Sequence, residues 1–219
     1  MSVYGYVQAG GGSTRFGVDK AQVEIAGKSM LDRTCALLAP VCKTVRVIAT
    51  PERYPHAPVP VAADKWPGEG PLGGILTALY HADDMSRALS LAPGVAEEAK
   101  TCCLIVSCDM PFLSREWLTF LCERGDRSKA DVVVPESENG LEPLCACWRV
   151  DAAPVIRRAF DGGVRKVTEA MKRLRMEVLD ESAWKRFDND GRLFWNMNTP
   201  EDYEQARRIF ERRSDKAGQ

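Results

Sequence analysis

The chain of 219 residues is long enough for one domain with a full hydrophobic core, and such a core needs no disulfide or metal to support it. The chain has 30 Lys and Arg residues and 31 Asp and Glu residues, which give a formal charge of −1. A chain without a net positive charge is a poor candidate for general nucleic-acid binding, so any anion-binding site must be a local cluster of cations. The 45% hydrophobic and 28% charged residues exclude disordered, fibrous and membrane-embedded classes.

Two features of the sequence predict a cytoplasmic protein. Residues 1–8 lack the basic and apolar regions of a secretory signal, and no apolar run is long enough to span a membrane. The eight cysteines form no CxxC motif, and Cys145-x-Cys147 lacks a second pair at zinc-ligand spacing. We therefore interpret the cysteines as small buried hydrophobes in a reducing compartment, and we expect no membrane association.

Strands and helices are predicted to alternate through the first half of the chain. Residues 3–8 form a β-prone run that enters a glycine-rich loop. Ser29 is a predicted N-cap, with Asp32 three residues on and a helical apolar pattern after it. A strand over residues 45–49, a helix over 72–80 and a strand over 102–106 follow.

The second half continues the alternation. Ser114 is expected to cap a helix, and residues 132–134 and 144–148 are predicted strands. A helix with one apolar face is predicted from the spacing of Val164, Val167, Met171 and Leu174. The last helix is expected to begin after Thr199, with Pro200 at its first position. Residues 87–100 are interpreted as a surface insertion and residues 214–219 as a frayed tail.

The alternation predicts an α/β, three-layer fold with a mostly parallel sheet. Ligands of such sheets bind beyond the carboxyl ends of the strands. The glycine-rich loop and Asp109, which both follow predicted strands, should therefore lie at the same edge of the sheet.

The loop over residues 9–20 has the composition of a triphosphate site. It is not a Walker A motif, because two residues separate Gly17 from Lys20, and it is not a dinucleotide fingerprint, because Arg15 stands where the third Gly should be. Its glycines nevertheless allow backbone N–H groups to point at one anion, with Arg15 and Lys20 as nearby positive charges. The alternative is a flexible turn with two solvated cations.

A second glycine pattern, Gly68-x-Gly70-x-x-Gly73, matches the dinucleotide motif in the wrong context, because it follows a proline-rich stretch and not a strand. Asp64 lies just upstream, and Gly73 is expected to open a helix whose N-terminus faces an anion or a substrate.

Asp109 ends a predicted buried strand and precedes Met110-Pro111. A carboxylate held rigidly at this position suits Mg²⁺, which takes one or two carboxylates and completes its coordination with phosphate oxygens and water. The alternative is a turn or helix-cap residue.

Five stretches of the sequence, taken in order, resemble the molybdenum cofactor guanylyltransferases, a family of nucleotidyltransferases with a Rossmann-like, glycosyltransferase-A type fold. They are Ala9–Ala21, Asp64 with Pro67–Gly74, Cys108–Leu113, Glu142–Leu144 and Asn196–Asp202. Ala9-Gly10-Gly11 and Asp19-Lys20 distinguish this family from related cytidylyltransferases and sugar-nucleotide enzymes. Two departures are Gln8, where the family usually has Leu, and Thr50, near which many members have an Asn that contacts the nucleotide.

The resemblance implies that GMP passes from GTP to molybdopterin, with release of pyrophosphate, and it implies a role for each matching residue. Asp109, Lys20 and Arg15 are the expected catalytic residues, with Asp109 the ligand of Mg²⁺. The nucleotide is expected to contact Gln8, Ala9, Gly10, Gly11, Gly12, Ser13, Lys20, Asp64, Gly73 and Asp109. The acceptor is expected to contact Arg165, Lys166, Asn196 and Asn198, although the basic residues between 157 and 175 also fit a solvated helix face.

The expected organisation is one nucleotidyltransferase domain over residues 1–213, with a nucleotide-binding half up to about residue 113 and an acceptor-binding half after it. Further expected partners are other proteins of molybdenum cofactor biosynthesis and molybdoenzyme chaperones. Two alternatives are another nucleotidyltransferase of this fold, acting on a cytidylyl or sugar-phosphate substrate, and a nucleotide-binding regulator without catalysis. Intact Asp109, Lys20 and Arg15 argue against the regulator.

Overall fold

A computed structural model describes residues 3–9, 19–90 and 101–217 of the chain. One sheet has the strand order β10-β7-β9-β6-β1-β4-β5, with β8 paired to β7. These strands are β1 (Val3–Gln8), β4 (Thr44–Ala49), β5 (Val61–Ala63), β6 (Cys102–Ser107), β7 (Val132–Ser137), β8 (Gly140–Leu141), β9 (Cys145–Arg149) and β10 (Met176–Leu179). A separate hairpin joins β2 (Glu24–Ile25) and β3 (Lys28–Ser29).

The sheet is mostly parallel, as the alternation predicts. Strand β1 pairs in parallel with β4 and β6, β4 with β5, and β7 with β10. Strand β9 runs antiparallel to both of its neighbours, β6 and β7. Because β9 runs the other way, it begins at the edge where the parallel strands end.

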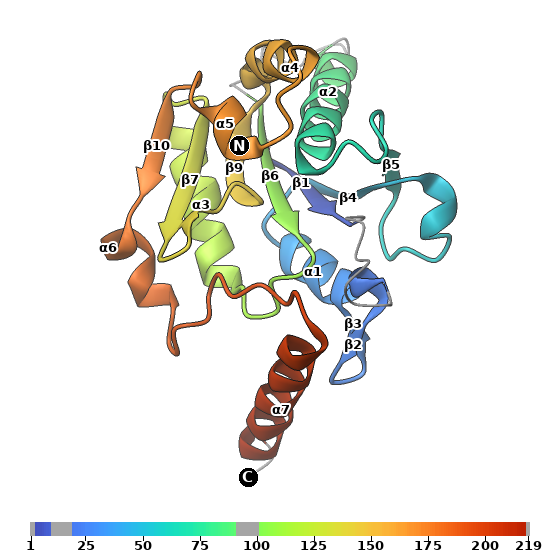
Figure 1. Ribbon diagram of the computed structural model, residues 1–219, viewed down its shortest axis with the longest axis vertical. Coiled ribbons are helices and arrows are strands. Elements are labelled where there is room, and N and C mark those ends of the chain that lie inside the picture. Colours follow the sequence, from blue (N-terminus) through green and yellow to red (C-terminus); the bar gives the residue numbers. More distant parts are fainter. Residues whose placement is uncertain (1–2, 10–18, 91–100, 218–219) are drawn as a thin grey trace.

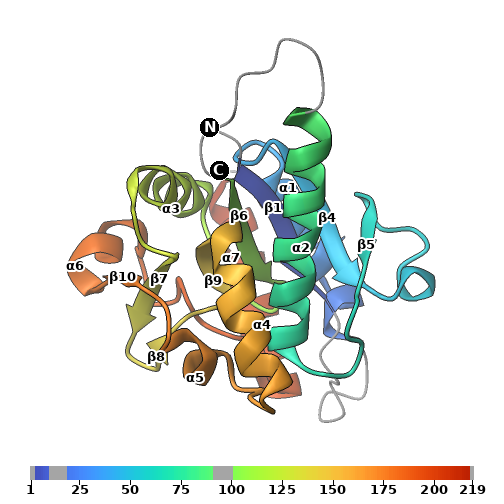
Figure 2. The same cartoon turned by 90° about the horizontal axis from the view of Figure 1, so that it is seen from above.

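Helices cover both faces of the sheet, which gives the expected three layers (Figures 1 and 2). The helices are α1 (Met30–Leu38), α2 (Pro71–Ser90), α3 (Arg115–Arg127), α4 (Ala153–Asp161), α5 (Val167–Met171), α6 (Glu181–Trp184) and α7 (Pro200–Ala217). Short 3₁₀ turns are η1 (Lys20–Gln22), η2 (Pro51–Arg53), η3 (Val150–Ala152) and η4 (Lys185–Phe187). Helices α2 and α4 lie side by side on one face in both views.

Alternate residues of the buried strands supply the two cores. In β1, Val3 and Val7 pack with α1 and α3, whereas Tyr4 and Tyr6 pack with α2 and α4 on the other face. A third cluster attaches α7 through Ile25, Met30, Phe112, Met197 and Ala206. Figure 1 shows α7 projecting from the end of the molecule towards which β6 points.

Helix α3 comes close to the sheet at Gly125. A Cβ atom on Gly125 would lie 2.2 Å from Cys147 Sγ and 2.9 Å from Cys147 Cβ, so only glycine fits against β9 here. All eight cysteines are free thiols, and all except Cys42 are buried, as their interpretation as small hydrophobes predicts.

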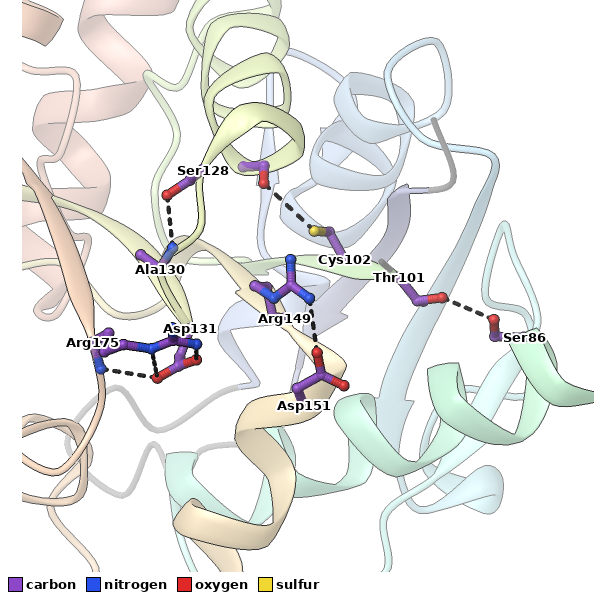
Figure 3. A network of polar contacts seen from close by, with 10 residues as sticks. Ser86, Thr101, Cys102, Ser128, Ala130, Asp131, Arg149, Asp151 and Arg175 are labelled. Atoms are coloured by element: carbon purple, nitrogen blue, oxygen red, sulfur yellow. Dashed lines mark hydrogen bonds and ion pairs between the residues drawn. The ribbon is translucent and has the colours of Figure 1, made fainter. Parts of the chain in front are cut away.

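Polar contacts close the edge of the sheet opposite the carboxyl ends of its parallel strands (Figure 3). Asp131, just before β7, accepts bonds from the Arg175 guanidinium and backbone. At the end of β9, the buried Arg149 contacts Asp151 at 2.7 Å.

Local predictions differ from the structure in three places. The predicted helix spanning Val164 and Leu174 is wrong in extent, because α5 covers only Val167–Met171, although Val164 and Leu174 still pack on the same core. Gly163 has a φ of +89°, a conformation that does not continue a helix, and it lies between α4 and α5. Helix α2 extends to Ser90, into the predicted insertion, and α7 extends to Ala217, past the expected end at residue 213.

Candidate active site

Backbone hydrogen bonds align the strand ends that carry the predicted site. Cys108 N donates to Gln8 O at 3.4 Å and Ala9 N donates to Ile48 O at 3.4 Å. Asp64 N donates to Ala49 O at 3.0 Å. The ends of β6, β1, β4 and β5 therefore lie side by side, and Asp109, Ala9 and Asp64 follow them.

Three distant parts of the chain meet at Lys20. Its ammonium Nζ donates to Asn198 Oδ1 at 2.8 Å and lies 3.9 Å from Asp109 Oδ2. The side chains of Lys20 and Asp109 are 16% and 22% exposed, so the pair is accessible but largely removed from bulk water. The structure thus brings together a predicted phosphate-binding cation, the predicted metal ligand and one predicted acceptor residue.

The cap of α7 holds Asn198 in this position. Asp202 Oδ2 accepts bonds from the backbone N–H groups of Asn198 and Thr199, both at 2.8 Å, while Asp202 N donates to Thr199 Oγ1. A further bond, from Met197 N to Asp109 O at 2.8 Å, ties this segment to the end of β6. The side chain of Asn198 is therefore presented by a rigid helix start.

Asp19 anchors the backbone next to Lys20. Its Oδ1 accepts from Ala21 N and caps η1, and its Oδ2 accepts from Arg53 Nε at 2.9 Å and from the Tyr54 hydroxyl at 2.8 Å. Burial, and then the bond to Asp19, raise the pKa of Tyr54, so the phenol stays protonated and donates. No pattern in the sequence predicts that Asp19 contacts Arg53 and Tyr54, which follow β4.

Asp64 is tied to the start of α2. Its Oδ1 accepts from Trp66 N and from Thr77 Oγ1, both at 3.0 Å. Among the described residues no group donates to Oδ2, so this oxygen is available to a ligand. At Gly73, a Cβ atom would lie 3.0 Å from Trp66 Cβ, which shows how closely this turn packs on the helix.

Gln8 reaches across to the same helix. Its Nε2 donates to Pro71 O at 3.0 Å, and a Cβ atom on Gly74 would lie 2.1 Å from that nitrogen. Oε1 of Gln8 is buried and has no partner among the described residues. The Gln8 amide therefore packs directly against the backbone of α2 at Gly74.

The remaining predicted residues divide into three groups. Gly10, Gly11, Gly12, Ser13 and Arg15 lie outside the described residues, while Ala9 is buried. Arg165 is bound to Glu69 Oε2 at 2.6 Å and to Phe160 O at 2.8 Å, and Lys166 is exposed. The Asn196 amide donates to Phe194 O. Of the four predicted acceptor residues, the described structure joins only Asn198 to Lys20.

The oxygens at this site fit a hard cation. Asp109 Oδ1 is buried without a hydrogen-bond partner in the described structure, and Asn198 Oδ1 accepts from the same Lys20 ammonium that lies 3.9 Å from Asp109 Oδ2. Carboxylate and amide oxygens are ligands that Mg²⁺ accepts when phosphates complete its coordination. In residues 3–9, 19–90 and 101–217, no group of three or more His, Cys, Asp or Glu side chains could hold a metal.

Glu142 is a site residue to which sequence reasoning gave no role. The residue is 7% exposed, and the charge on Asp109 acts on its carboxyl. Burial raises its pKa, the Ser137 hydroxyl at 2.7 Å opposes this, and the charge on Asp109 adds to the rise. Glu142 belongs to one of the five stretches that carry the family resemblance, which was its only signal in the sequence.

Comparison with known proteins identifies the family. Residues 5–176 match the profile of the MobA-like NTP transferase domain. The chain belongs to the MobA-like NTP transferase family. It is 33% identical over 207 residues to the molybdenum cofactor guanylyltransferase of Desulfosudis oleivorans, covering 94% of each chain. It is 31% identical over 209 residues to the probable molybdenum cofactor guanylyltransferase of Chloroflexus aggregans, covering 92% of each.

Solved structures agree with this family. Molybdopterin-guanine dinucleotide biosynthesis protein A from Archaeoglobus fulgidus aligns with a TM-score of 0.78 and 25% identity, over 95% of this chain and 99% of that one. A cytidylyltransferase acting on 2-C-methyl-D-erythritol 4-phosphate, from Thermus thermophilus, shares the fold at a TM-score of 0.62 and 15% identity, over 96% of this chain and 100% of that one. The MobA-like family is a nucleotidyltransferase family, and the predicted α/β fold is confirmed.

Proposed function

We propose that this protein transfers GMP from GTP to the terminal phosphate of molybdopterin, forming the guanine dinucleotide cofactor and pyrophosphate. Family membership supports the reaction class, and the relatives named as molybdenum cofactor guanylyltransferases support the substrates. The observation that carries the proposal is the meeting of Lys20, Asp109 and Asn198 at the carboxyl edge of the sheet.

The reaction needs positioning and charge neutralisation more than a protein nucleophile. An oxygen of the acceptor phosphate forms a bond to the α-phosphorus of GTP while the bond from that phosphorus to the bridging oxygen breaks, and pyrophosphate leaves with the electron pair. Lys20 would neutralise charge on the triphosphate and the leaving group. Bound Mg²⁺, held by Asp109, would supply further neutralisation of the phosphates.

Each half of the chain contributes one side of this arrangement. Asp19 fixes Lys20 from the nucleotide half, and the α7 cap fixes Asn198 from the acceptor half. Because Asn198 accepts directly from the Lys20 ammonium, the acceptor phosphate would be received beside the triphosphate. Proteins that supply molybdopterin or receive the product are further proposed partners. In the described part of the chain, no helix is both long and apolar enough to cross a membrane.

Product analysis tests the proposal. Purified protein is incubated with molybdopterin, Mg²⁺ and each of the four nucleoside triphosphates, and the dinucleotides are identified by mass spectrometry. We expect the guanine product, with GTP preferred over CTP and ATP by at least about tenfold in kcat/KM, which corresponds to about 1.4 kcal/mol. Equal incorporation of CMP and GMP would refute guanylyl specificity, and no dinucleotide with any base would refute the transfer itself.

A further inference from the structure

An acidic side chain stands directly beside the lysine of the candidate site. Asp19 precedes Lys20 in the chain, and consecutive Cα atoms lie only about 3.8 Å apart. The side chains of Asp19 and Lys20 are 21% and 16% exposed, so bulk water screens their charges only in part. A carboxylate in this position repels the phosphates that Lys20 would attract. A triphosphate site here therefore needs a second cation that offsets Asp19.

Arg53 is the cation that the fold brings to Asp19. Its Nε donates to Asp19 Oδ2 at 2.9 Å, and this is the one ion pair that Asp19 forms within the described residues. The Tyr54 hydroxyl donates to the same oxygen at 2.8 Å. Burial lowers the pKa of Arg53, but the bond to Asp19 and the charges nearby outweigh burial and raise this pKa, so the guanidinium stays charged. A positive charge thus offsets the negative one next to Lys20.

The segment after β4 holds Arg53 in this place. Arg53 N donates to Thr50 O at 3.0 Å and closes the turn η2. The guanidinium carbon Cζ lies 5.6 Å from the centre of the Tyr54 ring, and Tyr54 is 5% exposed and packs in the same core as Ala21. Asp19 is fixed from its own side, because its Oδ1 caps η1 through Ala21 N. The fold therefore positions both partners of the ion pair.

The charges of this group of side chains balance only when Arg53 is included. Lys20 and Arg53 carry two positive charges, and Asp19 and Asp109 carry two negative charges. Without Arg53 the other three would carry a net charge of −1, which opposes the binding of a triphosphate. We propose that Arg53 is a positioning residue that neutralises Asp19, so that Asp19 can fix the backbone at Lys20 without repelling GTP. This inference rests on the proposed function for the identity of the triphosphate.

Charge substitutions at the two positions test this proposal. GTP binding in the presence of Mg²⁺ is measured by isothermal titration calorimetry for the natural protein, for Arg53→Met, for Asp19→Asn and for the double variant. Arg53→Met leaves the Asp19 charge uncompensated, and we expect the Kd for GTP to rise about tenfold or more. Asp19→Asn keeps an oxygen that can cap η1 and removes the charge, so it should bind GTP at least as tightly as the natural protein. The double variant restores the balance of charge, and its Kd should return to within about threefold of the natural value.

Two controls separate the charge of Arg53 from its packing. The ratio of the Kd of Arg53→Met to that of the natural protein should fall towards one as the salt concentration rises, because salt screens the repulsion. Arg124→Met is the matched control, since it removes another cation and its ion pair with Glu177 at the end of α3. Gly125 O, next in the chain, accepts from Cys102 Sγ at the start of β6, so this ion pair lies at the opposite edge of the sheet from the candidate site. The Kd of Arg124→Met should stay within about twofold of the natural value.

Several results would overturn the role of Arg53. An unchanged Kd in Arg53→Met would do so, and so would a double variant that binds as weakly as Arg53→Met, because Arg53 would then contact GTP itself or support only the fold. Weaker binding by Asp19→Asn, or a Kd ratio that does not respond to salt, would show that the Asp19 charge is not what Arg53 offsets. If Arg53→Met fails to fold, Arg53→Lys takes its place: it keeps the charge, so its Kd should stay within about threefold, and a tenfold loss contradicts the proposal.

These titrations do not involve the acceptor, so they separate this inference from the proposed function. If the natural protein binds GTP but forms no guanine dinucleotide from molybdopterin, the proposed transfer fails, and the Kd values still decide the role of Arg53. If the dinucleotide forms and the expected order of Kd values is absent, the transfer stands and the role of Arg53 fails. A natural protein that does not bind GTP overturns both.

Discussion

Removal of the Lys20 ammonium should reduce catalysis far more than stability. Lys20 contacts Asn198 Oδ1 at 2.8 Å and Asp109 Oδ2 at 3.9 Å, and both charged side chains keep some solvent contact. Ion pairs of this kind contribute about 0.2–1 kcal/mol to the free energy of unfolding. We therefore expect Lys20→Met to lower the unfolding free energy by about 1 kcal/mol or less.

The same ammonium opposite a phosphate charge should contribute much more. At a separation of about 4 Å and an effective dielectric constant near 20, two unit charges interact by about 4 kcal/mol. Loss of one such preorganised group lowers rates about 10²–10³-fold in other enzymes. Single-turnover rates of GMP transfer should therefore fall about 10²–10³-fold in Lys20→Met.

Equilibrium GTP binding and chemical denaturation complete the comparison. Lys20→Arg is the matched control, because it keeps the charge and changes only its geometry, and it should retain more activity than Lys20→Met. If Lys20→Met leaves the single-turnover rate and GTP binding unchanged but lowers stability by several kcal/mol, the lysine is a structural residue and the reasoning fails.

Three other predictions follow from the geometry. Asp109→Asn should lower turnover about 10²–10³-fold at saturating Mg²⁺ with the fold intact by circular dichroism, and near-normal turnover would contradict the metal role. Gly125→Ala should destabilise the protein by about 1–3 kcal/mol in urea denaturation, although alanine usually favours a helix, because its Cβ would meet Cys147 Sγ at 2.2 Å; an increase in stability would contradict this packing. Burial raises the pKa of Glu142 in the folded protein, so folding favours the protonated carboxyl over the charged one. The resulting contribution to the free energy of unfolding is fully present below about pH 4 and is lost as the pH rises through the folded-state pKa. The unfolding free energy of Glu142→Gln relative to the natural protein should accordingly increase from pH 4 to pH 7, and a constant difference would show that the carboxyl is not perturbed.

Short-range features of this fold could be predicted because their physics is local. Ser29, Ser114 and Thr199 were expected as helix caps, and each side chain accepts from the backbone N–H three residues on. The positions of Lys20 and Asp109 after predicted strands placed them at one edge of the sheet, where the structure has them 3.9 Å apart.

Long-range contacts and weak elements could not be predicted in this way. The Arg165 side chain is bound to Glu69, which lies 96 residues earlier, and no periodicity encodes that pairing. Strand β10 (Met176–Leu179) is a short edge strand with Met176 and Val178 exposed, so it lacks the pattern of a buried strand. Glu142 was visible in the sequence, but its burial and the electrostatic influence of Asp109 on it arise only when β6 and β9 pair.

The hydrogen bond between Lys20 and Asn198 joins residues that are 178 positions apart. During synthesis the glycine-rich loop leaves the ribosome well before Asn198 and helix α7, which follows it. A chain that stops before Asn198 lacks one of the three side chains that meet at Lys20. A chain cut between Asn198 and Asp202 keeps Asn198 but loses the carboxylate that holds it, so such a cut should abolish the proposed transfer.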